Sequence, residues 1–596
     1  MQKEHSFHIP VMGIGFTVDT PLKVAQYGID SVISLVDDIL LEKLRKMYSQ
    51  KYSISYKEIT DKIEDFRAKR ITEYLNLINE LATKRFNELK NDGKKILKYL
   101  DLLPDNSATK QEFNKATKRF GLQESLQWIK DKLSMGSIDV NIMTKVDKEN
   151  YKNGEKLPVK FNDAHSALRG YANSNLNSSI ILSAGMNTRL FSYMEFFDDF
   201  YPNTENMIKK KISIKVSDFR SALIQGKFLA KKGLWVSEYR IESGLNCGGH
   251  AFAKDGFLLG PILKSFKDKK SELIETIHAI FKQALSIKKR YVPEKPLPVK
   301  ITVQGGIGTA KEHQFLIDHY KVDSVGWATP FLLVPEVTNV DEITFNKLID
   351  ATEDDVYLSN ISPLGVPFLN LKNNTKDLEK ISLIKQGKPG TACPKKFVCL
   401  NNEFNKNLCT ASHEYQKLKI NELKSTNPTP EEYKIGYEKI VEKACICVGL
   451  GTSALLVNNL DTRIEGKGVS VCPGPNIAYF SKILSLKEMI DHIYGRTNVI
   501  TRTDRPNVFI KELNIFVDFL KNKIDETKIS LTDQQQKYLF NFLKNLNEGI
   551  DYYFELFSTI KTKFDHKKSN ILDELKSYKQ TLNTLQYKLE EQLCIH

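Results

Sequence analysis

The stretch ITVQGGIGTAKEHQFLIDHYKVDSVGWATPFL, residues 301–332, contains two apolar runs that each end in glycine and are separated by one helical pattern. Glycine adopts positive φ angles and lets the backbone approach a ligand closely. The N-terminus of a following helix offers N–H groups that suit a phosphate. We therefore expect two neighbouring strands whose carboxyl ends, at Gly305, Gly306 and Gly326, hold one phosphate, as strands seven and eight of a (β/α)8 barrel do. The alternative is that these glycines serve two tight turns and nothing else.

Six earlier segments have the same short, apolar and β-branched character. They are HIPVMGIG (8–15), DSVISLV (30–36), SIDVNIM (137–143), SSIILSAG (178–185), KISIKVS (211–217) and LWVSEYRI (234–241). Helical stretches separate most of them, which indicates parallel strands in βα repeats. Together with PVKITVQGG (298–306) and VDSVGW (322–327) they make eight strands. The sequence thus predicts an α/β fold, a TIM (β/α)8 barrel built from residues 1–37 and 136–350.

Three regions do not follow this alternation. Residues 38–135 are long, charged and helical in period, and we interpret them as a helical insertion in a βα loop, in the role of a lid. Residues 351–500 are rich in loops and hold six of the eight cysteines. Residues 501–596 are again helical and charged, which predicts a C-terminal helical extension that serves packing or a homodimer.

The composition is that of a soluble globular chain, with 41% hydrophobic and 27% charged residues among 596. The net charge is +14, but acids and bases are interleaved, which favours a lysine-rich solvated surface over nucleic-acid binding. The sequence has no run of about 18 apolar residues, so we expect no membrane span. The N-terminus lacks the pattern of a signal peptide. We expect a cytoplasmic protein whose cysteines are reduced thiols or metal ligands.

A third glycine cluster, in YRIESGLNCGGHAF (239–252), follows the sixth predicted strand. Glycines beside His250 leave the backbone close to a flat ligand and leave the imidazole free to face it. A histidine in that position can act as a general base, since its ordinary pKa lies near ~6.5. The alternative is a structural histidine in a loop.

At this point the sequence resembles a known family. A strand ending in Gly-Gly-His, then Gly-Gly-Ile-Gly, then Val-Gly-x-x-x-Pro-Phe-Leu is similar to nitronate monooxygenases and to their relatives, the FMN-dependent enoyl-acyl-carrier-protein reductases. The opening IPVMGIGFTVDTPLKVAQYG resembles the first βα unit of that family. The resemblance covers roughly residues 8–335 without the insertion.

The resemblance implies FMN bound non-covalently at one end of the barrel, with His250 in the place of the catalytic histidine. Other positions would contact the flavin or hold its phosphate: Met12, Gly13, Asn141, Lys215, Gly248, Gly249, Gly305, Gly306, Gly308, Gly326 and Thr329. The sequence departs from the family at GLNCGGH, where Asn246 replaces an acidic residue, which puts the substrate in question more than the cofactor.

The cysteines form a second candidate site. Cys393, Cys409, Cys445, Cys447 and Cys472 lie with Cys399 within 80 residues, and thiolates in such loops can hold a 4Fe-4S cluster or zinc. Their spacing matches no standard motif, and C-x-C is too tight for a zinc knuckle. The alternative is that they are buried cysteines acting as small apolar residues.

Two enzyme functions and one other function follow from these patterns. The first is an FMN-dependent oxidoreductase of the nitronate monooxygenase-like class, with His250 moving a proton beside the flavin. The second is an enoyl-thioester reductase that takes electrons from NAD(P)H and reduces an acyl substrate. The third is a flavin barrel kept as a scaffold in an RNA-binding or assembly protein.

Overall fold

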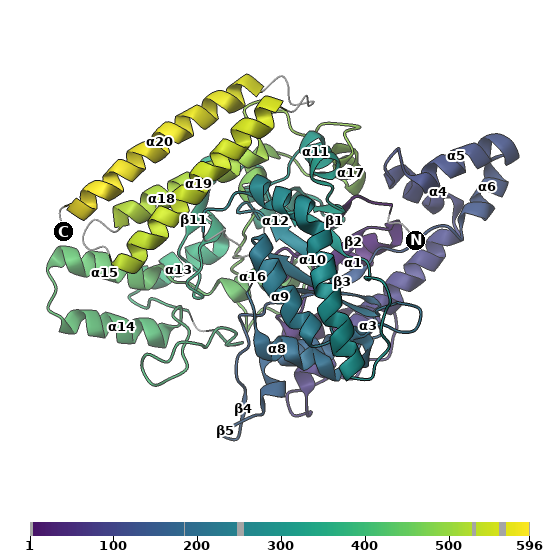
Figure 1. Cartoon of the computed structure of the whole chain (residues 1–596). Coiled ribbons are helices and arrows are strands. Elements are labelled where there is room, and N and C mark those ends of the chain that lie inside the picture. Colours follow the sequence, from purple (N-terminus) through teal and green to yellow (C-terminus); the bar gives the residue numbers. More distant parts are fainter. Residues whose placement is uncertain are drawn as a thin grey trace.

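The computed structural model describes residues 4–183, 185–246, 255–391, 393–526, 532–559 and 568–594. Its centre is a closed barrel of parallel strands (Figure 1). The order around the barrel is β1-β10-β9-β8-β7-β6-β3-β2, and β2 pairs with β1. All eight predicted strands are confirmed: β1 Phe7–Ile9, β2 Asp30–Ser34, β3 Ile138–Ile142, β6 Ser178–Leu182, β7 Lys210–Val216, β8 Val236–Glu242, β9 Lys300–Gln304 and β10 Ser324–Gly326.

Helices surround the barrel because every strand presents one apolar face outward. In β8, Tyr239 and Ile241 are buried toward the helices. Gly226 of α9 lets that helix approach so closely that an added Cβ would clash with the Tyr239 hydroxyl. The alternate residues Glu238 and Glu242 belong to the other face, which is the barrel interior. The surrounding helices include α1 Thr20–Val24, α7 Asp163–Ala172, α8 Thr188–Tyr193, α9 Phe219–Lys231, α10 Leu259–Ile287 and α11 Ala310–Tyr320.

The insertion is helical as predicted, but it is not a lid. Its first two helices, α2 (Asp38–Lys51) and α3 (Phe66–Lys90), pack against each other, and α3 packs against α7 in the outer layer of the barrel. The others form a projecting lobe with its own apolar cluster (Figure 1): α4 Gly93–Leu102, α5 Ala108–Phe120 and α6 Leu122–Ile129.

The contacts of Tyr99 show at which end of the barrel this lobe lies. Its hydroxyl donates a hydrogen bond to the carbonyl of Ser134 at 2.9 Å and lies against Gly28. Gly28 and Ser134 precede β2 and β3, so the lobe lies at the amino-terminal ends of the strands. It is therefore at the opposite end from the barrel mouth, our name for the end where the strands finish.

The region after the barrel contains more helix than its sequence suggested. It holds α12 Glu342–Ile349, the antiparallel pair β11 Val356–Ser359 and β12 Phe368–Leu371, and helices α13 Thr375–Lys385, α14 His413–Ser425, α15 Pro430–Glu442, α16 Ile446–Val457 and α17 Leu486–Ile493. A small hairpin of β4 (Tyr151–Lys152) and β5 (Glu155–Lys156) precedes α7.

Helix α16 lies over the loop that follows β1. The backbone N–H groups of Ile14 and Gly15 donate to the carbonyl of Leu450 at 3.2 and 2.8 Å. Gly15 lies so near Gly451 that a Cβ would meet its carbonyl oxygen at 2.7 Å. The cysteine-containing region thus covers part of the barrel mouth.

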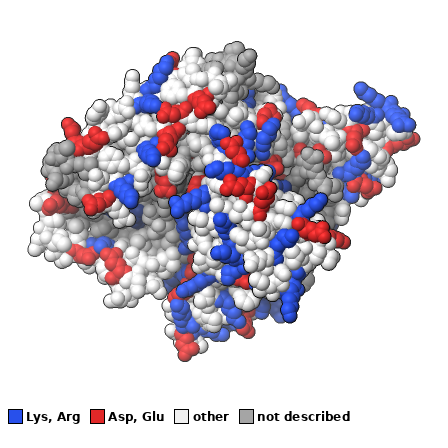
Figure 2. Space-filling model, in the orientation of Figure 1, with Lys and Arg blue, Asp and Glu red and all other residues white. Residues whose placement is uncertain are grey.

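The predicted C-terminal helices are α18 Val508–Glu526, α19 Asp533–Thr559 and α20 Lys568–Cys594. Helices α18 and α19 pack on α10, where the Tyr553 hydroxyl accepts a hydrogen bond from the N–H of Gly260 at 3.1 Å. Basic and acidic side chains are mixed across the face in Figure 2. Within the described residues no single helix is long and apolar enough to cross a membrane, and only α15 and α16 together, bent by 43°, reach that length and composition.

Candidate active site at the barrel mouth

Four buried polar side chains meet at the carboxyl ends of β7, β8 and β9. One carboxylate oxygen of Glu242 forms an ion pair with the Nζ of Lys215 at 3.0 Å and accepts a hydrogen bond from the Nε2 of Gln304 at 2.9 Å. The same oxygen accepts from the Nδ2 of Asn246 at 2.7 Å. We call Lys215, Glu242, Asn246 and Gln304 the mouth cluster. It fixes the position of a positive charge and of two amides at the end of the barrel.

One buried acceptor of the mouth cluster has no hydrogen-bond partner among the described residues. The Oε1 of Gln304 is buried and accepts no hydrogen bond from any described residue. An unsatisfied buried acceptor costs about 1–3 kcal/mol, so it suits a ligand that brings an N–H donor. Asn141, on β3, donates to the carbonyl of Ile181 at 3.2 Å.

The loop after β1 is closed in by the rest of the chain. Met12 is fully buried, and its N–H donates to the Thr17 hydroxyl at 3.2 Å. Gly13 has a φ of +58°, and an added Cβ would lie 3.0 Å from the Phe16 ring and 3.4 Å from Leu450. Both predicted flavin contacts therefore lie just beyond the end of β1, in a loop that α16 covers.

The glycines after β9 have the backbone conformation that the sequence predicts. Gly305 and Gly306 have φ angles of +107° and +79°. At the start of the helix that follows them, an internal carboxylate occupies two backbone N–H groups. A carboxylate oxygen of Glu312 accepts from the N–H groups of Gly308 and Thr309 at 3.0 and 3.2 Å, in a capping box at the start of α11. Glu312 thus takes two of the N–H groups that precede the first residue of α11, and the phosphate role of Gly305, Gly306 and Gly308 stays a prediction.

A buried arginine from a distant part of the chain completes this corner. Arg505 pairs with Glu312 at 2.8 Å, and its guanidinium donates to the Gly306 carbonyl at 3.0 Å and to the Asn476 Oδ1 at 3.1 Å. An added Cβ at Gly308 would meet its Nη2 at 2.7 Å. The space beside the predicted phosphate loop thus contains a cation whose charge is already balanced.

The other predicted phosphate residues are buried at the end of β10. At Gly326 an added Cβ would lie 2.6 Å from the Cβ of Gln304 and 3.0 Å from the Nε2 of His8. Glycine is required there by close packing of strands. Thr329 begins the 3-10 helix η5, Thr329–Leu333, and is 4% exposed.

His250, Gly248 and Gly249 lie outside the described residues, so their predicted roles stay predictions. The two ends of their loop are described. The carboxylate of Glu512, on α18, accepts from the Ser243 hydroxyl at 2.8 Å, from the Gly244 N–H at 2.9 Å and from the Leu259 N–H at 2.7 Å. Burial raises the pKa of Glu512, although these hydrogen bonds act against it.

Charged groups also fill the barrel interior below the mouth cluster. Glu238 accepts from the Nε of Arg240 at 2.8 Å and from the Thr302 hydroxyl at 2.5 Å. Burial by itself raises the pKa of Glu238, but the charge and hydrogen bond of Arg240 outweigh it and lower that pKa to about 2. The interior is therefore ionised and paired, unlike the branched aliphatic layers usual in such barrels.

Four of the five predicted metal ligands come together. Cys393, Cys409, Cys445 and Cys447 share an apolar cluster with Val146, Phe397, Val398, Ala411 and Val448. Cys472 belongs instead to the main core. Across the part of the chain that the structure describes, no three His, Cys, Asp or Glu side chains are arranged to hold a metal ion. A cluster or zinc site therefore stays a prediction without structural support.

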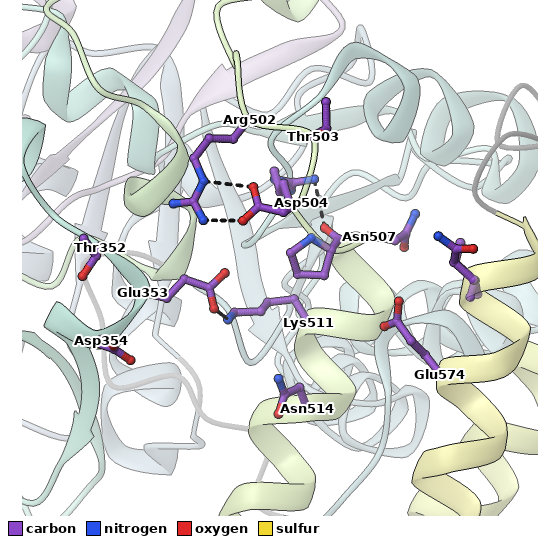
Figure 3. Close-up of a pocket in the computed structure, with 14 residues that line it drawn as sticks. Thr352, Glu353, Asp354, Arg502, Thr503, Asp504, Asn507, Lys511, Asn514 and Glu574 are labelled. Carbon is purple, nitrogen blue, oxygen red and sulfur yellow. Dashed lines mark hydrogen bonds and ion pairs between the residues drawn. The ribbon is translucent and has the colours of Figure 1, made fainter.

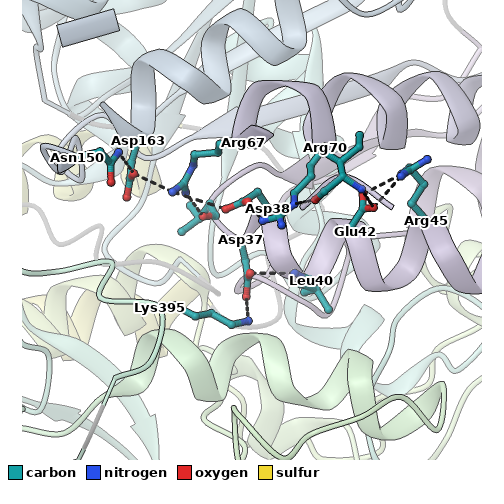
Figure 4. Close-up of polar contacts among 12 residues, drawn as sticks. Asp37, Asp38, Leu40, Glu42, Arg45, Arg67, Arg70, Asn150, Asp163 and Lys395 are labelled. Atoms are coloured by element: carbon teal, nitrogen blue, oxygen red, sulfur yellow. Dashed lines mark hydrogen bonds and ion pairs between the residues drawn. The ribbon is translucent and has the colours of Figure 1, made fainter. Parts of the chain in front are cut away.

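A buried ion-pair network fastens the cysteine region to the barrel mouth. The Nζ of Lys395 lies 2.5 Å from Asp37 and 3.1 Å from Glu465. Asp37 follows β2 and also caps α2 by accepting from the N–H of Leu40 at 2.9 Å. Figure 4 shows Lys395 reaching Asp37 across the boundary between the two regions.

A hollow of about 680 Å³ lies between the loop at 502–507 and helices α18 and α20, and Arg505 is among its lining residues (Figure 3). Its charges are largely balanced internally, since Arg502 pairs with Asp504 at 2.5 Å and Lys511 with Glu353 at 2.8 Å.

Several residues of the site were not predicted from the sequence. Glu242 and Gln304 end their strands on the inward face, a period-two signal that was present in the sequence. Asn476, Arg505 and Glu312 are distant in sequence from one another, and no local pattern marks them as neighbours.

Comparison with known proteins gives similarity in fold only. No protein-family model matches the chain, and no curated protein matches it. The enoyl reductase domain of MlnA from the macrolactin biosynthesis cluster of Bacillus amyloliquefaciens is 15% identical, with 70% of this chain and 88% of that chain covered and a TM-score of 0.32. FabK from Thermotoga maritima is 13% identical, with 67% and 83% covered and a TM-score of 0.28. Likeness at this level carries no argument about activity.

Proposed function

We propose that this chain is an FMN-dependent oxidoreductase of the nitronate monooxygenase-like class, with the flavin ring at the mouth cluster. The observation that carries the proposal is the unpartnered Oε1 of Gln304 beside Lys215 and Glu242. A flavin ring edge alternates carbonyl acceptors with an N–H donor. Gln304 can accept from that N–H, and the Lys215 ammonium and the Asn246 amide can donate to the carbonyls.

The residues present fit the ring better than they fit the phosphate. Gly305 and Gly306 supply the positive φ angles of a phosphate loop. Arg505 supplies a nearby cation, but Glu312 neutralises it and also accepts from the N–H groups of Gly308 and Thr309. When bound, FMN would supply the acceptor and donor of electron pairs. The protein's part would be to hold the ring through the mouth cluster and, through His250, to move a proton.

The experiment separates the proposed reaction from its alternative. Protein loaded with FMN is mixed anaerobically with a nitronate and, separately, with NADPH, and flavin bleaching is followed by absorbance. The proposal expects bleaching by the nitronate, and His250→Ala should slow it ~10²–10⁴-fold, the usual contribution of general acid–base catalysis. Bleaching by NADPH alone, followed by reoxidation with an enoyl thioester, would instead make the chain an enoyl-thioester reductase.

A further inference from the structure

Large apolar side chains stay exposed on the projecting lobe, where α5 turns into α6. Phe120 ends α5 and is 52% exposed, and Leu122 begins α6 and is 43% exposed. Gly121 joins them with a φ of +83°, which makes the turn tight. Helices α5 and α6 lie on the side of the lobe away from the barrel (Figure 1). The apolar pair therefore points into solvent at the outer part of the molecule.

The apolar pair extends the lobe's own core to its surface. In α5, Phe120 follows the buried Phe113 and Ala116 at helical spacing. In α6, Leu122 precedes the buried Leu126 by one turn. An apolar stripe that continues out of a core into solvent is typical of a surface that binds a protein or a membrane.

A basic and aromatic face adjoins this apolar pair. Trp128 of α6 is 43% exposed, and the Nζ of Lys132 lies 4.1 Å from the centre of its ring. Lys132 also pairs with Glu112 of α5 at 2.5 Å, which joins the two helices on this face. Lys115 and Arg119 follow Glu112 by one and two turns, so they lie on the same side of α5.

Arg119 connects this face with the apolar pair. Its guanidinium lies 4.8 Å from the centre of the Phe120 ring. Residues 108–133 contain six basic and three acidic residues, and one of those acids, Glu112, is already paired with Lys132. The lobe thus presents Trp, Phe and Leu together with an excess of positive charge. That combination is complementary to a negatively charged surface with an apolar layer beneath it.

We propose that the lobe binds the surface of an anionic lipid bilayer, with Phe120 and Leu122 below the headgroups and the basic side chains at the level of the lipid phosphates. Tryptophan is enriched at membrane–water interfaces, and peripheral helices that bind anionic lipids carry Lys and Arg beside Trp, Phe and Leu. Because the lobe lies at the opposite end of the barrel from the mouth cluster, the inference does not rest on the proposed flavin chemistry.

The observations favour a bilayer over a single-stranded nucleic acid. Both ligands would attract the basic side chains, but nucleic-acid bases bind by stacking on exposed rings. Leu122 offers no ring, and the rings of Trp128 and Phe120 already have Lys132 and Arg119 over them. Aliphatic and aromatic side chains both gain from burial among lipid tails.

Tryptophan fluorescence of the full chain reports this contact specifically. The chain has three tryptophans, and Trp235 and Trp327 are buried, so the exposed Trp128 is the one that can change its surroundings. With vesicles of phosphatidylcholine and phosphatidylglycerol, we expect the emission to shift to shorter wavelength and quenching by acrylamide to fall. Vesicles of phosphatidylcholine alone should have little effect, and added salt should reverse the shift because it screens the headgroup charges.

Sedimentation with the same vesicles measures the affinity of variants. Phe120→Ser combined with Leu122→Ser should weaken binding by at least about tenfold, less than the full effect of exposing two such side chains. Lys115→Glu combined with Arg119→Glu should remove the preference for phosphatidylglycerol. Ile287→Ser is the matched control, because Ile287 is an equally exposed apolar residue at the end of α10, outside the lobe. It should leave binding unchanged.

Thermal unfolding shows whether each variant keeps its fold, as substitutions at exposed positions should. Absence of binding to the phosphatidylglycerol vesicles would overturn the proposal, and so would equal binding by the Phe120 and Leu122 double variant and the unaltered chain. A shift of the Trp128 emission by single-stranded polyuridylic acid, without one by the vesicles, would also overturn it and would make the lobe a nucleic-acid site.

Discussion

The carboxylate of Glu512 accepts a hydrogen bond from the backbone N–H of Leu259 at 2.7 Å, and its other oxygen accepts one from Gly244 at 2.9 Å. Gly244 and Leu259 flank the segment that contains His250. One side chain of the C-terminal helices thus holds both ends of the glycine–histidine loop, which gives those helices a role at the barrel mouth.

Glu512→Ala should loosen this loop. The substitution leaves two backbone N–H groups and the Ser243 hydroxyl without their acceptor, and we expect a loss of about 3 kcal/mol in unfolding free energy. Urea unfolding and limited proteolysis near residues 244–259 measure the effect. Glu526→Ala, an exposed position on the same helix, is the control and should change stability by less than about 0.5 kcal/mol. Equal effects of the two variants would contradict the assigned role.

We also expect Glu512 to make the unfolding free energy depend on pH. Because burial raises the folded-state pKa of Glu512 above its unfolded value, the folded protein binds this proton more tightly than the unfolded chain. Its contribution to stability is complete below the unfolded pKa and is lost as the pH rises through the folded pKa. Glu512→Gln should therefore remove part of the decline in unfolding free energy on the alkaline side of about pH 4.3. An unchanged pH profile in this variant would show that Glu512 is not the group responsible.

We expect alanine substitutions at Arg505 and Arg502 to differ greatly in the unfolding free energy that they cost, because Arg505 pairs with the buried Glu312. Arg505→Ala leaves the buried Glu312 carboxylate without its counter-charge, and breaking such a pair costs about 3–5 kcal/mol. Arg502, three residues earlier, pairs with Asp504 at the surface, and Arg502→Ala should cost at most about 1 kcal/mol. Thermal unfolding of both variants measures this, and a comparable loss in both would contradict the buried network.

Much of the fold could be predicted from the sequence because the pattern that marks each barrel strand lies within a few consecutive residues. Short apolar runs rich in β-branched residues predicted all eight strands, and β8 and β9 each carry a polar residue at the inward final position. The role of residues 38–135 was wrong because helical periodicity does not tell at which end of a barrel a helix will lie. Tyr99 and Ser134 decide that through a tertiary contact.

Most helices of residues 351–500 were missed for a different reason. Helix α15 begins with Thr429, Pro430 and Glu432, a capping box that the sequence does display. Its apolar residues are sparse, so periodicity gave no signal. The Arg505–Glu312 pair lay beyond any local argument, since 193 residues separate the two side chains.

We expect the ion pairs of Lys395 to hold the cysteine region against the barrel. Lys395→Ala leaves Asp37 and Glu465 buried without the ammonium between them, and we expect a loss of about 3–5 kcal/mol with new protease cleavage near residues 390–410. Lys406→Ala, which removes an exposed pair with Glu414, is the control and should leave both readouts unchanged. Protease resistance of the Lys395 variant would mean that this network does not hold the region.

FMN binding to the purified full chain tests the central claim most directly. Titration followed by quenching of flavin fluorescence should give one FMN per chain. Gln304→Leu removes the unpartnered Oε1 that we assign to the flavin N–H, and it should weaken binding by at least about tenfold, the value of one hydrogen bond of about 1.4 kcal/mol. Lys209→Ala, at an exposed lysine beside β7, should leave binding unchanged. Absence of FMN binding by the unaltered chain, or equal binding by the Gln304 variant, would contradict the account.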